Sequence, residues 1–231
     1  MKNNVLIIVQ CRFNSKRLHG KALYPLSGIP ILSFLLRRLK AGLLEEEYSI
    51  VLATSERQQD DIVASWGLEE GIPVFRGDED DVLKRYVDCL DRYPSNMVVR
   101  VTADNPLTCP ESIERLVMIM KSENADYAQC NNIPCGAGAD AFSSGVLIYM
   151  AQEVKELDER EHINLHLLRN KDKFKIYFLN MEGELARPDL RMTVDTREDW
   201  QRLQSLFNTA DEEPWKISLH EIIKRMDKKL I

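Results

Sequence analysis

The chain has 231 residues, 44% of them hydrophobic, which is enough to bury one substantial core and short for two independent domains. Its 37 acidic residues outnumber 31 basic ones, and the formal net charge of -6 argues against a general nucleic-acid-binding protein, which needs a basic face. No apolar run is long enough for a membrane span or a signal-peptide core, and the five cysteines include no CxxC pair, so we expect a cytoplasmic protein without a disulfide framework, a zinc knuckle or a membrane partner.

The first half of the chain alternates short β-branched runs with stretches of helical period. This alternation is typical of a three-layer α/β fold with a mainly parallel sheet. We predict a strand at Val5–Val9, a polar loop at Cys11–Gly28, and a helix that Pro30 opens and Gly42 closes. Three further strand-then-helix units follow: Ile50–Thr54 with Gln58–Trp66, which Gly67 ends, Val74–Arg76 with Asp80–Tyr93, and Met97–Thr102 with Pro110–Glu123.

After Tyr127 the pattern loosens, with Gly136 and Gly138 in a loop. The elements predicted in this part are a helix at Arg160–Asn170, strands near Lys175–Leu179 and Arg191–Val194, and helices at Glu198–Phe207 and Ser218–Lys228. No repeat or flexible linker separates the two halves, so we expect a single domain over residues 1–231.

The loop after the first strand places four cations, Arg12, Lys16, Arg17 and Lys21, and His19 within ten residues. Ligands of open α/β sheets bind at the carboxyl ends of strands. Cations held this close repel one another unless an anion joins them, so a polyphosphate is the expected partner. The alternative is a solvated basic loop.

This loop is not a Walker A motif. Ser15 stands where the first glycine should be, and Ala22 replaces the Ser or Thr that binds magnesium. No GxGxxG follows the strand either. Both a P-loop ATPase and a Rossmann dehydrogenase are therefore disfavoured.

Two carboxylates, Asp104 and Asp195, each close a predicted strand at its carboxyl end. Magnesium is typically held by one or two carboxylates together with substrate phosphates and waters. Each residue could instead cap the helix that follows it. Together with the basic loop, the pair predicts a Mg²⁺ site for a triphosphate.

Several motifs together resemble the cytidylyltransferase family that includes 3-deoxy-manno-octulosonate and acylneuraminate cytidylyltransferases, especially its branch of spore-coat polysaccharide biosynthesis protein F. The matching stretches are 10–12, 17–21, 75–77 with 81–86, 100–107, 161–162, and 193–196 with Asp199. The resemblance covers nearly the whole chain. It implies a nucleotide-diphospho-sugar transferase (GT-A-like) fold. It also implies a reaction in which an acceptor oxygen attacks the α-phosphorus of CTP and pyrophosphate leaves.

The resemblance also implies roles for single residues. Arg12 and Lys21 would hold the triphosphate, and Asp104 and Asp195 the Mg²⁺ ion. The second-rank phosphate ligands would be Lys16 and Arg17, Arg76 would lie near the base, and Asp140 and His162 would bind the acceptor. Residues of about 1–127 would form the nucleotide-binding half, and those of about 128–231 the acceptor-binding half, which also forms a homodimer.

The chain departs from the family pattern in places. His19 stands where the family usually has Pro, Ala103 where it has Gly, and the segment around Asp140 lacks a second carboxylate. A zinc site at His162 and His166 is disfavoured because the sequence is not HExxH.

The leading hypothesis is a CTP-dependent enzyme that transfers CMP to an acidic, nonulosonic-type sugar for a surface polysaccharide. A nucleotidyltransferase with another NTP or a non-sugar anionic acceptor is an alternative within enzymes. A catalytically inactive GT-A-like binding protein is an alternative of another class. A GT-A glycosyltransferase is disfavoured, because no Asp-x-Asp motif follows a strand.

Overall fold

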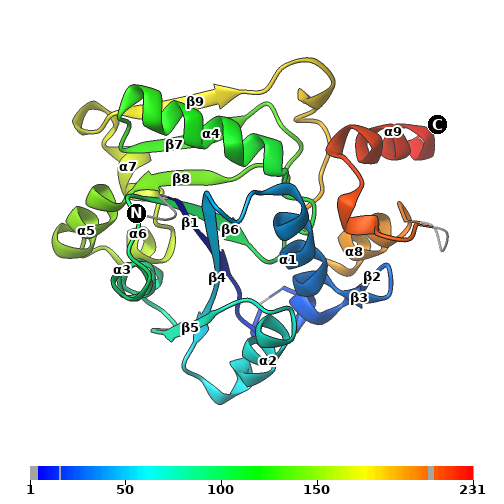
Figure 1. Ribbon diagram of the computed structural model, residues 1–231, viewed down its shortest axis with the longest axis horizontal. Helices are drawn as coiled ribbons and strands as arrows, with labels where there is room; N and C mark the ends of the chain where they lie inside the picture. The colour runs from blue at the N-terminus through cyan, green and yellow to red at the C-terminus, as the bar shows by residue number, and fades with distance from the viewer. Residues whose placement is uncertain (1–4, 16, 208–210, 231) are drawn as a thin grey trace.

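A single sheet forms the centre of the computed structural model, which describes residues 5–15, 17–207 and 211–230 (Figure 1). In the described residues its seven strands lie in the order β5-β4-β1-β6-β8-β7-β9. The strands are β1 (Val5–Gln10), β4 (Tyr48–Ser55), β5 (Val74–Gly77), β6 (Met97–Thr102), β7 (Tyr127–Asn131), β8 (Asp140–Ser143) and β9 (Ile176–Asn180). Strands β1, β4, β5 and β6 are parallel, as are β7 and β9, and only β8 runs antiparallel to its neighbours β6 and β7. The predicted α/β class with a mainly parallel sheet is confirmed.

Helices cover both faces of this sheet (Figure 1). The α-helices of the described residues are α1 (Ile31–Gly42), α2 (Asp61–Glu69), α3 (Val82–Arg92), α4 (Pro110–Glu123), α5 (Ser144–Glu153), α6 (Leu157–Glu161), α7 (Leu165–Arg169), α8 (Arg197–Gln204) and α9 (Leu219–Leu230), the last two beside the sheet. Side chains alternate across a strand, so Ile7 of β1 packs with α1, α2 and α4, whereas Leu6 and Ile8 pack with α3, α5 and α7. Two apolar cores, one on each face, therefore fix the three layers.

A third core lies beside the sheet, where α8 and α9 meet the small hairpin of β2 (Pro25–Leu26) and β3 (Ile29–Pro30) (Figure 1). The Trp200 indole donates to the Pro25 carbonyl at 2.7 Å and ties α8 to this hairpin. The hairpin leads directly into α1, so the C-terminal helices support the segment that follows the basic loop.

The elements predicted for the first half are confirmed, with small differences at their ends. Gly67 does not end α2, which continues to Glu69. A Cβ atom at Gly67 would lie 2.4 Å from Leu52 Cδ2, so glycine is needed here because the helix packs closely on the sheet.

The second half differs more from the prediction. Strands β7 and β8 and helix α5 were not predicted, and residues 160–170 form two short helices instead of one. The segment 191–194 is not a strand, since only a single bridge pairs Arg191 with Cys135. Strands β7 and β8 carry polar residues among apolar ones without strict alternation, and strand pairing within the sheet decides their structure.

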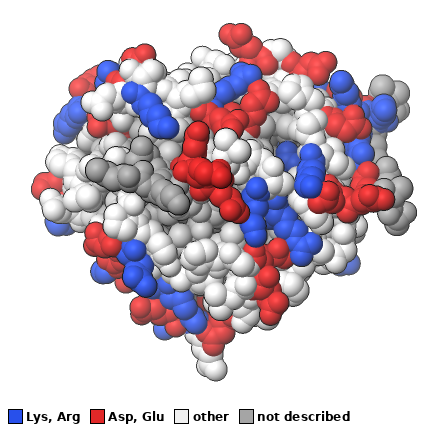
Figure 2. Space-filling model, in the orientation of Figure 1, with Lys and Arg blue, Asp and Glu red and all other residues white. Residues whose placement is uncertain are grey.

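Charge is mixed on the surface. On the face that Figure 2 shows, basic and acidic side chains lie beside one another. Within the described ranges, no helix is long and apolar enough to cross a membrane. A charged ligand on such a protein is recognised by a local cluster of side chains rather than by one broad field.

Candidate active site

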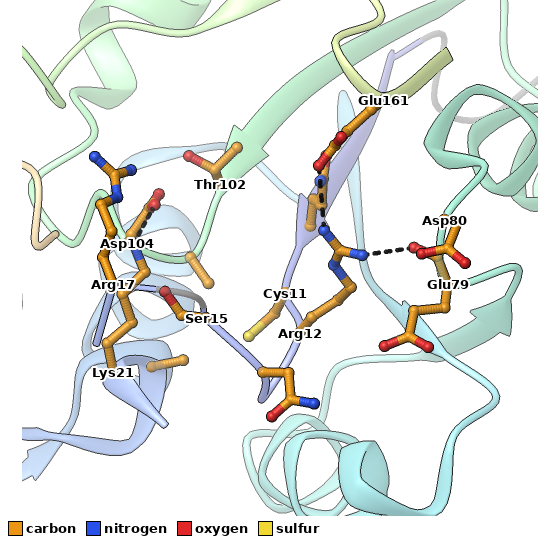
Figure 3. A pocket seen from close by; sticks show the side chains of 14 residues that line it. Cys11, Arg12, Ser15, Arg17, Lys21, Glu79, Asp80, Thr102, Asp104 and Glu161 are labelled. Atoms are coloured by element: carbon orange, nitrogen blue, oxygen red, sulfur yellow. Dashed lines mark hydrogen bonds and ion pairs between the residues drawn. The ribbon is translucent and has the colours of Figure 1, made fainter. Parts of the chain in front are cut away.

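A cavity of about 630 Å³ opens at the carboxyl ends of β1 and β6, the edge of the sheet where ligands of α/β proteins bind (Figure 3). The β1–β2 loop, the segment before α3, the end of β6 and the end of α6 supply its walls. The lining residues are Gln10, Cys11, Arg12, Asn14, Ser15, Arg17, Lys21, Ala22, Glu79, Asp80, Thr102, Ala103, Asp104 and Glu161. Three of the four predicted cations and one of the two predicted metal ligands therefore line one cavity, and Lys16 lies outside the described residues.

The basic loop is held at both ends. At its start, the fully buried Asp60 accepts a hydrogen bond from the Phe13 backbone N–H at 2.6 Å and another from the Ser55 N–H at 3.3 Å. At its end, the Gly20 N–H donates to the Phe13 carbonyl at 3.1 Å, with Gly20 in the left-handed region at φ 66°. His19, which departs from the family pattern, packs edge-on against the Phe13 ring. The loop is therefore anchored at both ends, while the Arg17 side chain within it is 67% exposed.

Asp104 and Asp195 meet through the backbone. The Val194 N–H donates to the Asp104 carbonyl at 2.8 Å and aligns the segment before Asp195 with the end of β6. The Lys21 ammonium donates to Asp104 Oδ2 at 2.7 Å and to Asp195 Oδ1 at 2.9 Å. The expectation that Asp195 closes a strand is wrong, because its segment is an irregular extended stretch, yet both carboxylates converge on one cation.

Asp195 is a buried carboxylate that three cations surround. Arg17 reaches its Oδ1 at 2.7 Å, and Arg191 reaches its Oδ2 at 2.7 Å. Burial raises the pKa of the Asp195 carboxyl, but the hydrogen bond and charge of Lys21, with Arg17 and Arg191, outweigh it and leave that pKa below its usual value. Asp195 is thus a carboxylate at neutral pH, as a metal ligand must be.

Asp199 holds Asp195 in place from behind. It accepts the backbone N–H groups of Asp195 at 3.0 Å and Thr196 at 3.1 Å, and it pairs with Arg191 and Arg202. Burial raises the pKa of the Asp199 carboxyl, but these donors, led by Arg202, bring that pKa far below its ordinary value. The capping box at the start of α8 thereby fixes the backbone that carries Asp195.

The donor set fits a divalent cation held partly by substrate. The carboxylates of Asp104, which is 25% exposed, and of Asp195 lie 2.7 Å and 2.9 Å from the same nitrogen, Lys21 Nζ. Among the described residues, no group of three or more His, Cys, Asp and Glu side chains could hold a metal ion. Magnesium accepts one or two carboxylates when phosphates and waters complete its shell, so Asp104 and Asp195 suit Mg²⁺ with a triphosphate.

Arg12 lies across the cavity from Lys21 and Asp104 (Figure 3). Its Nη1 donates to the Glu79 carbonyl at 2.7 Å, and its Nη2 lies 3.7 Å from a carboxylate oxygen of Glu161. Sequence reasoning did not assign Glu79 and Asp80 to the site. The acidic run 78–81 after Gly77 was the available signal, since a polar cluster at the carboxyl end of β5 belongs to the same edge of the sheet.

Asp81 and Arg85 do not form the helix pair that their spacing allows. Asp81 caps α3 by accepting the Lys84 N–H at 2.9 Å, and its other oxygen pairs with Arg160 Nη2 at 2.7 Å. This ion pair fastens α6 next to the segment before α3. The neighbouring Glu161 consequently faces the cavity.

Arg76 does not line the cavity. Its guanidinium donates to the Ser55 carbonyl at 2.9 Å, the Arg57 carbonyl at 2.8 Å and the Asp61 carboxylate at 2.6 Å. These bonds join β5 to the segment that leads into α2. These acceptors hold the Arg76 guanidinium outside the cavity.

Of the two predicted acceptor residues, Asp140 lines a cavity beside the larger one and His162 does not. Asp140 lines a smaller neighbouring cavity of about 200 Å³, where it pairs with Arg100 and accepts the Tyr127 hydroxyl at 3.0 Å. Thr102 lines both cavities. His162 is exposed at the end of α6 and lines neither of these two, and His166 sits on the next helix, bound to Glu159 at 2.6 Å. The two histidines therefore do not share one helix face.

Known proteins resemble this chain over nearly its full length. Residues 6–228 match the model of a family described as cytidylyltransferase. The spore coat polysaccharide biosynthesis protein SpsF of Bacillus subtilis is 29% identical over 229 residues, which cover 98% of this chain and 95% of SpsF. An 8-amino-3,8-dideoxy-manno-octulosonate cytidylyltransferase of Shewanella amazonensis is 25% identical over 179 residues, covering 76% of this chain and 64% of that protein.

The fold has a close counterpart among solved structures. A cytidylyltransferase from Leptospira borgpetersenii superposes with a TM-score of 0.89 and 28% identity, over 99% of this chain and 95% of that one. This likeness confirms the three-layer nucleotidyltransferase fold that the motifs implied.

Proposed function

The chain belongs to the cytidylyltransferase family, and we propose that it transfers CMP from CTP to an acidic sugar of the nonulosonic type, with release of pyrophosphate, for a surface polysaccharide. One observation carries the proposal: a single cavity is lined by Arg17, Lys21 and Asp104 on one side and by Arg12 on the other, and the Lys21 ammonium also binds Asp195. The names of two relatives support the product class, since one acts in spore coat polysaccharide biosynthesis and one on an octulosonate.

The transfer is a substitution at the α-phosphorus of CTP. A hydroxyl oxygen of the acceptor forms a bond to that phosphorus, and the bond to the oxygen bridging the α- and β-phosphates breaks. Pyrophosphate leaves with the bonding electron pair, and the hydroxyl proton passes to water. Such a reaction needs in-line positioning and stabilisation of charge rather than covalent help from the protein.

The residues of the cavity are suited to this task. Lys21 and Arg17 on one side and Arg12 on the other are cations that a triphosphate can bridge. Asp104 and Asp195 would hold Mg²⁺, which when bound neutralises phosphate charge as the leaving group departs. Asp199 and Arg191 hold the backbone and the carboxylate of Asp195, whose Oδ1 binds the Lys21 ammonium that lines the cavity.

The smaller cavity is the proposed acceptor subsite. It adjoins the larger one at Thr102, which lines both, so a bound acceptor would lie beside the phosphates. Arg100 there is a fixed cation held by Asp140, and such a group suits the carboxylate of an acidic sugar. In this proposal the role of Asp140 is to hold Arg100 in position through their ion pair.

We also propose that the chain forms a homodimer through its second half. Among the described residues of that half, four large apolar side chains are exposed: Ile148 at 41%, Tyr149 at 47%, Leu157 at 84% and Phe178 at 38%; the first half exposes Leu44, Ile62, Leu68 and Met118 as well. Exposed apolar area of this kind is typical of interfaces. Light scattering after size exclusion gives the mass directly, and a monomer at micromolar concentration would contradict this part.

The activity is tested by pyrophosphate release. Purified protein with Mg²⁺ is incubated with each of CTP, UTP, GTP and ATP against a panel of nonulosonic and octulosonic acids. We expect turnover with CTP and an acidic sugar, loss of turnover in Asp104→Ala and Asp195→Ala, and no change in Glu213→Ala, which removes an exposed carboxylate of a surface ion pair. Turnover with a different nucleotide, or none with any pair, would contradict the proposal.

A further inference from the structure

Arg85 is a fully buried arginine directly behind the nucleotide cavity. Its Nη1 donates to the Asp78 carbonyl and, at 3.2 Å, to the Glu79 carbonyl. Its Nε and Nη2 are buried without a hydrogen-bond partner, and it forms no ion pair with a carboxylate, as far as the described residues show. A buried guanidinium with unmet donors and no directly paired carboxylate is unfavourable for the ligand-free fold.

Arg38 shows that burial need not leave an arginine in this state. It is 4% exposed and donates to the carbonyls of Thr108 at 2.9 Å, Ile217 at 2.7 Å and Trp215 at 3.1 Å. In the part of the chain that the structure describes, none of its nitrogens is both fully buried and without a partner. Arg38 is therefore a structural arginine, and Arg85 differs from it by its unmet donors and by its place behind the cavity.

The two arginines of the site share one acceptor. Arg12 Nη1 at 2.7 Å and Arg85 Nη1 at 3.2 Å both donate to the Glu79 carbonyl oxygen. Burial lowers the pKa of the Arg85 guanidinium, and the charge of Arg12 lowers it as well, while Tyr86 and the carboxylates of Asp60 and Asp78 oppose the change. Two like charges this close destabilise each other until an anion is bound nearby.

We infer that Arg85 is a positioning residue for the nucleotide: it holds the 78–79 carbonyls, through them the Arg12 guanidinium, and adds a positive charge without a directly paired carboxylate behind the bound triphosphate. The inference rests on the proposed function, since CTP is the anion that relieves the repulsion. Arg85 does not reach the cavity itself, and so it acts through Arg12. Its cost to the free protein is offset when the nucleotide binds.

The test compares Arg85→Met with the matched control Arg38→Met. Melting temperature is measured without ligand and with saturating CTP and Mg²⁺, and KM for CTP and kcat are measured from pyrophosphate release. For Arg85→Met we expect an unliganded melting temperature equal to or above the wild type, a smaller shift with CTP, and KM raised at least about tenfold with kcat within about threefold. Arg85→Lys, which keeps the charge, should recover KM to within about threefold of the wild type.

Arg38→Met should lower the melting temperature and leave KM unchanged. Arg85→Met that behaves in this way would overturn the inference, because its role would then be structural. If Arg85→Met does not fold, Arg85→Gln replaces it with the same two outcomes for KM. A wild-type protein that CTP does not stabilise would overturn the proposed function and the inference with it, whereas equal stabilisation of wild type and Arg85→Met overturns the inference alone.

Discussion

Replacing Lys21 with methionine removes the ammonium group that joins Asp104 to Asp195 while keeping a side chain of similar length. Lys21 is 12% exposed, Asp195 10% and Asp104 25%, so all three groups are largely desolvated. Without the ammonium, two carboxylates face each other with less compensation. Both the fold and the proposed metal site should respond.

The cost to stability follows from burial and from what remains. Removing one partner of a buried ion pair costs about 3–5 kcal/mol. Here Asp195 keeps Arg17 and Arg191, and Asp104 is a quarter exposed, so we expect a smaller loss of about 2–3 kcal/mol. For a chain of this length the entropy of unfolding is about 0.5 kcal/mol/K, which converts the loss to a melting temperature roughly 4–6 °C lower.

The assay is thermal unfolding with and without 5–10 mM Mg²⁺, roughly the range in which weak carboxylate sites fill, with ionic strength matched by NaCl. In Lys21→Met, Mg²⁺ should raise the melting temperature more than in the wild type, because the carboxylates lack their own cation. The control Lys216→Met breaks an exposed pair with Glu213 and should change it by about 1 °C or less. An unchanged melting temperature in Lys21→Met, or equal effects of Mg²⁺ and NaCl on it, would refute this reasoning.

Three other predictions test the surroundings of the site. The pKa values of the Asp195 and Asp199 carboxyls are lowered in the folded protein, so the unfolded chain binds more protons below about pH 4. The stability that these two carboxylates contribute is therefore complete above that pH and is lost on further acidification. Urea midpoints measured at pH 3–7 should fall steeply at the acid end, and Asp199→Asn should make this fall shallower. Asp60→Asn removes the charge that anchors the basic loop, so it should lower the free energy of unfolding by about 1.5–3 kcal/mol and raise KM for CTP. Chemical denaturation and steady-state kinetics measure the two effects, and a stable variant with unchanged KM would contradict the prediction. Arg76→Met should lower the melting temperature by a few degrees, roughly, yet leave KM for CTP within about threefold of the wild type, and a larger change in KM would place Arg76 in the nucleotide site after all.

The local pattern was enough to predict most of the first half. Strands β1, β4, β5 and β6 and the helices between them follow from apolar runs and helical periods, because each element buries one regular face. The second half was predicted less well. Strand β8 is short and partly polar, and its pairing with β6 on one side and β7 on the other stabilises it as a strand.

The site divides in the same way. Arg12, Arg17 and Lys21 could be assigned from the sequence because they share one loop at the end of the first strand, where ligands of this fold class bind. Arg76 stands in a matching motif, but its direction depends on carbonyl acceptors from another loop. No periodicity encodes such a choice.

The fold class, the basic loop and the types of residue proposed to bind a triphosphate could be recognised in the amino-acid sequence alone. Which of these residues lie together depends on how the chain folds: Lys21 and Asp195 are 174 positions apart, and a backbone hydrogen bond from Val194 to Asp104 brings the carboxylates together. The acidic wall at Glu79 and the buried Arg85 likewise depend on how the segment before α3 folds against the basic loop. The chemical type of each side chain can be read from its position in the sequence, whereas the distances between residues remote in sequence follow from the packing of whole elements.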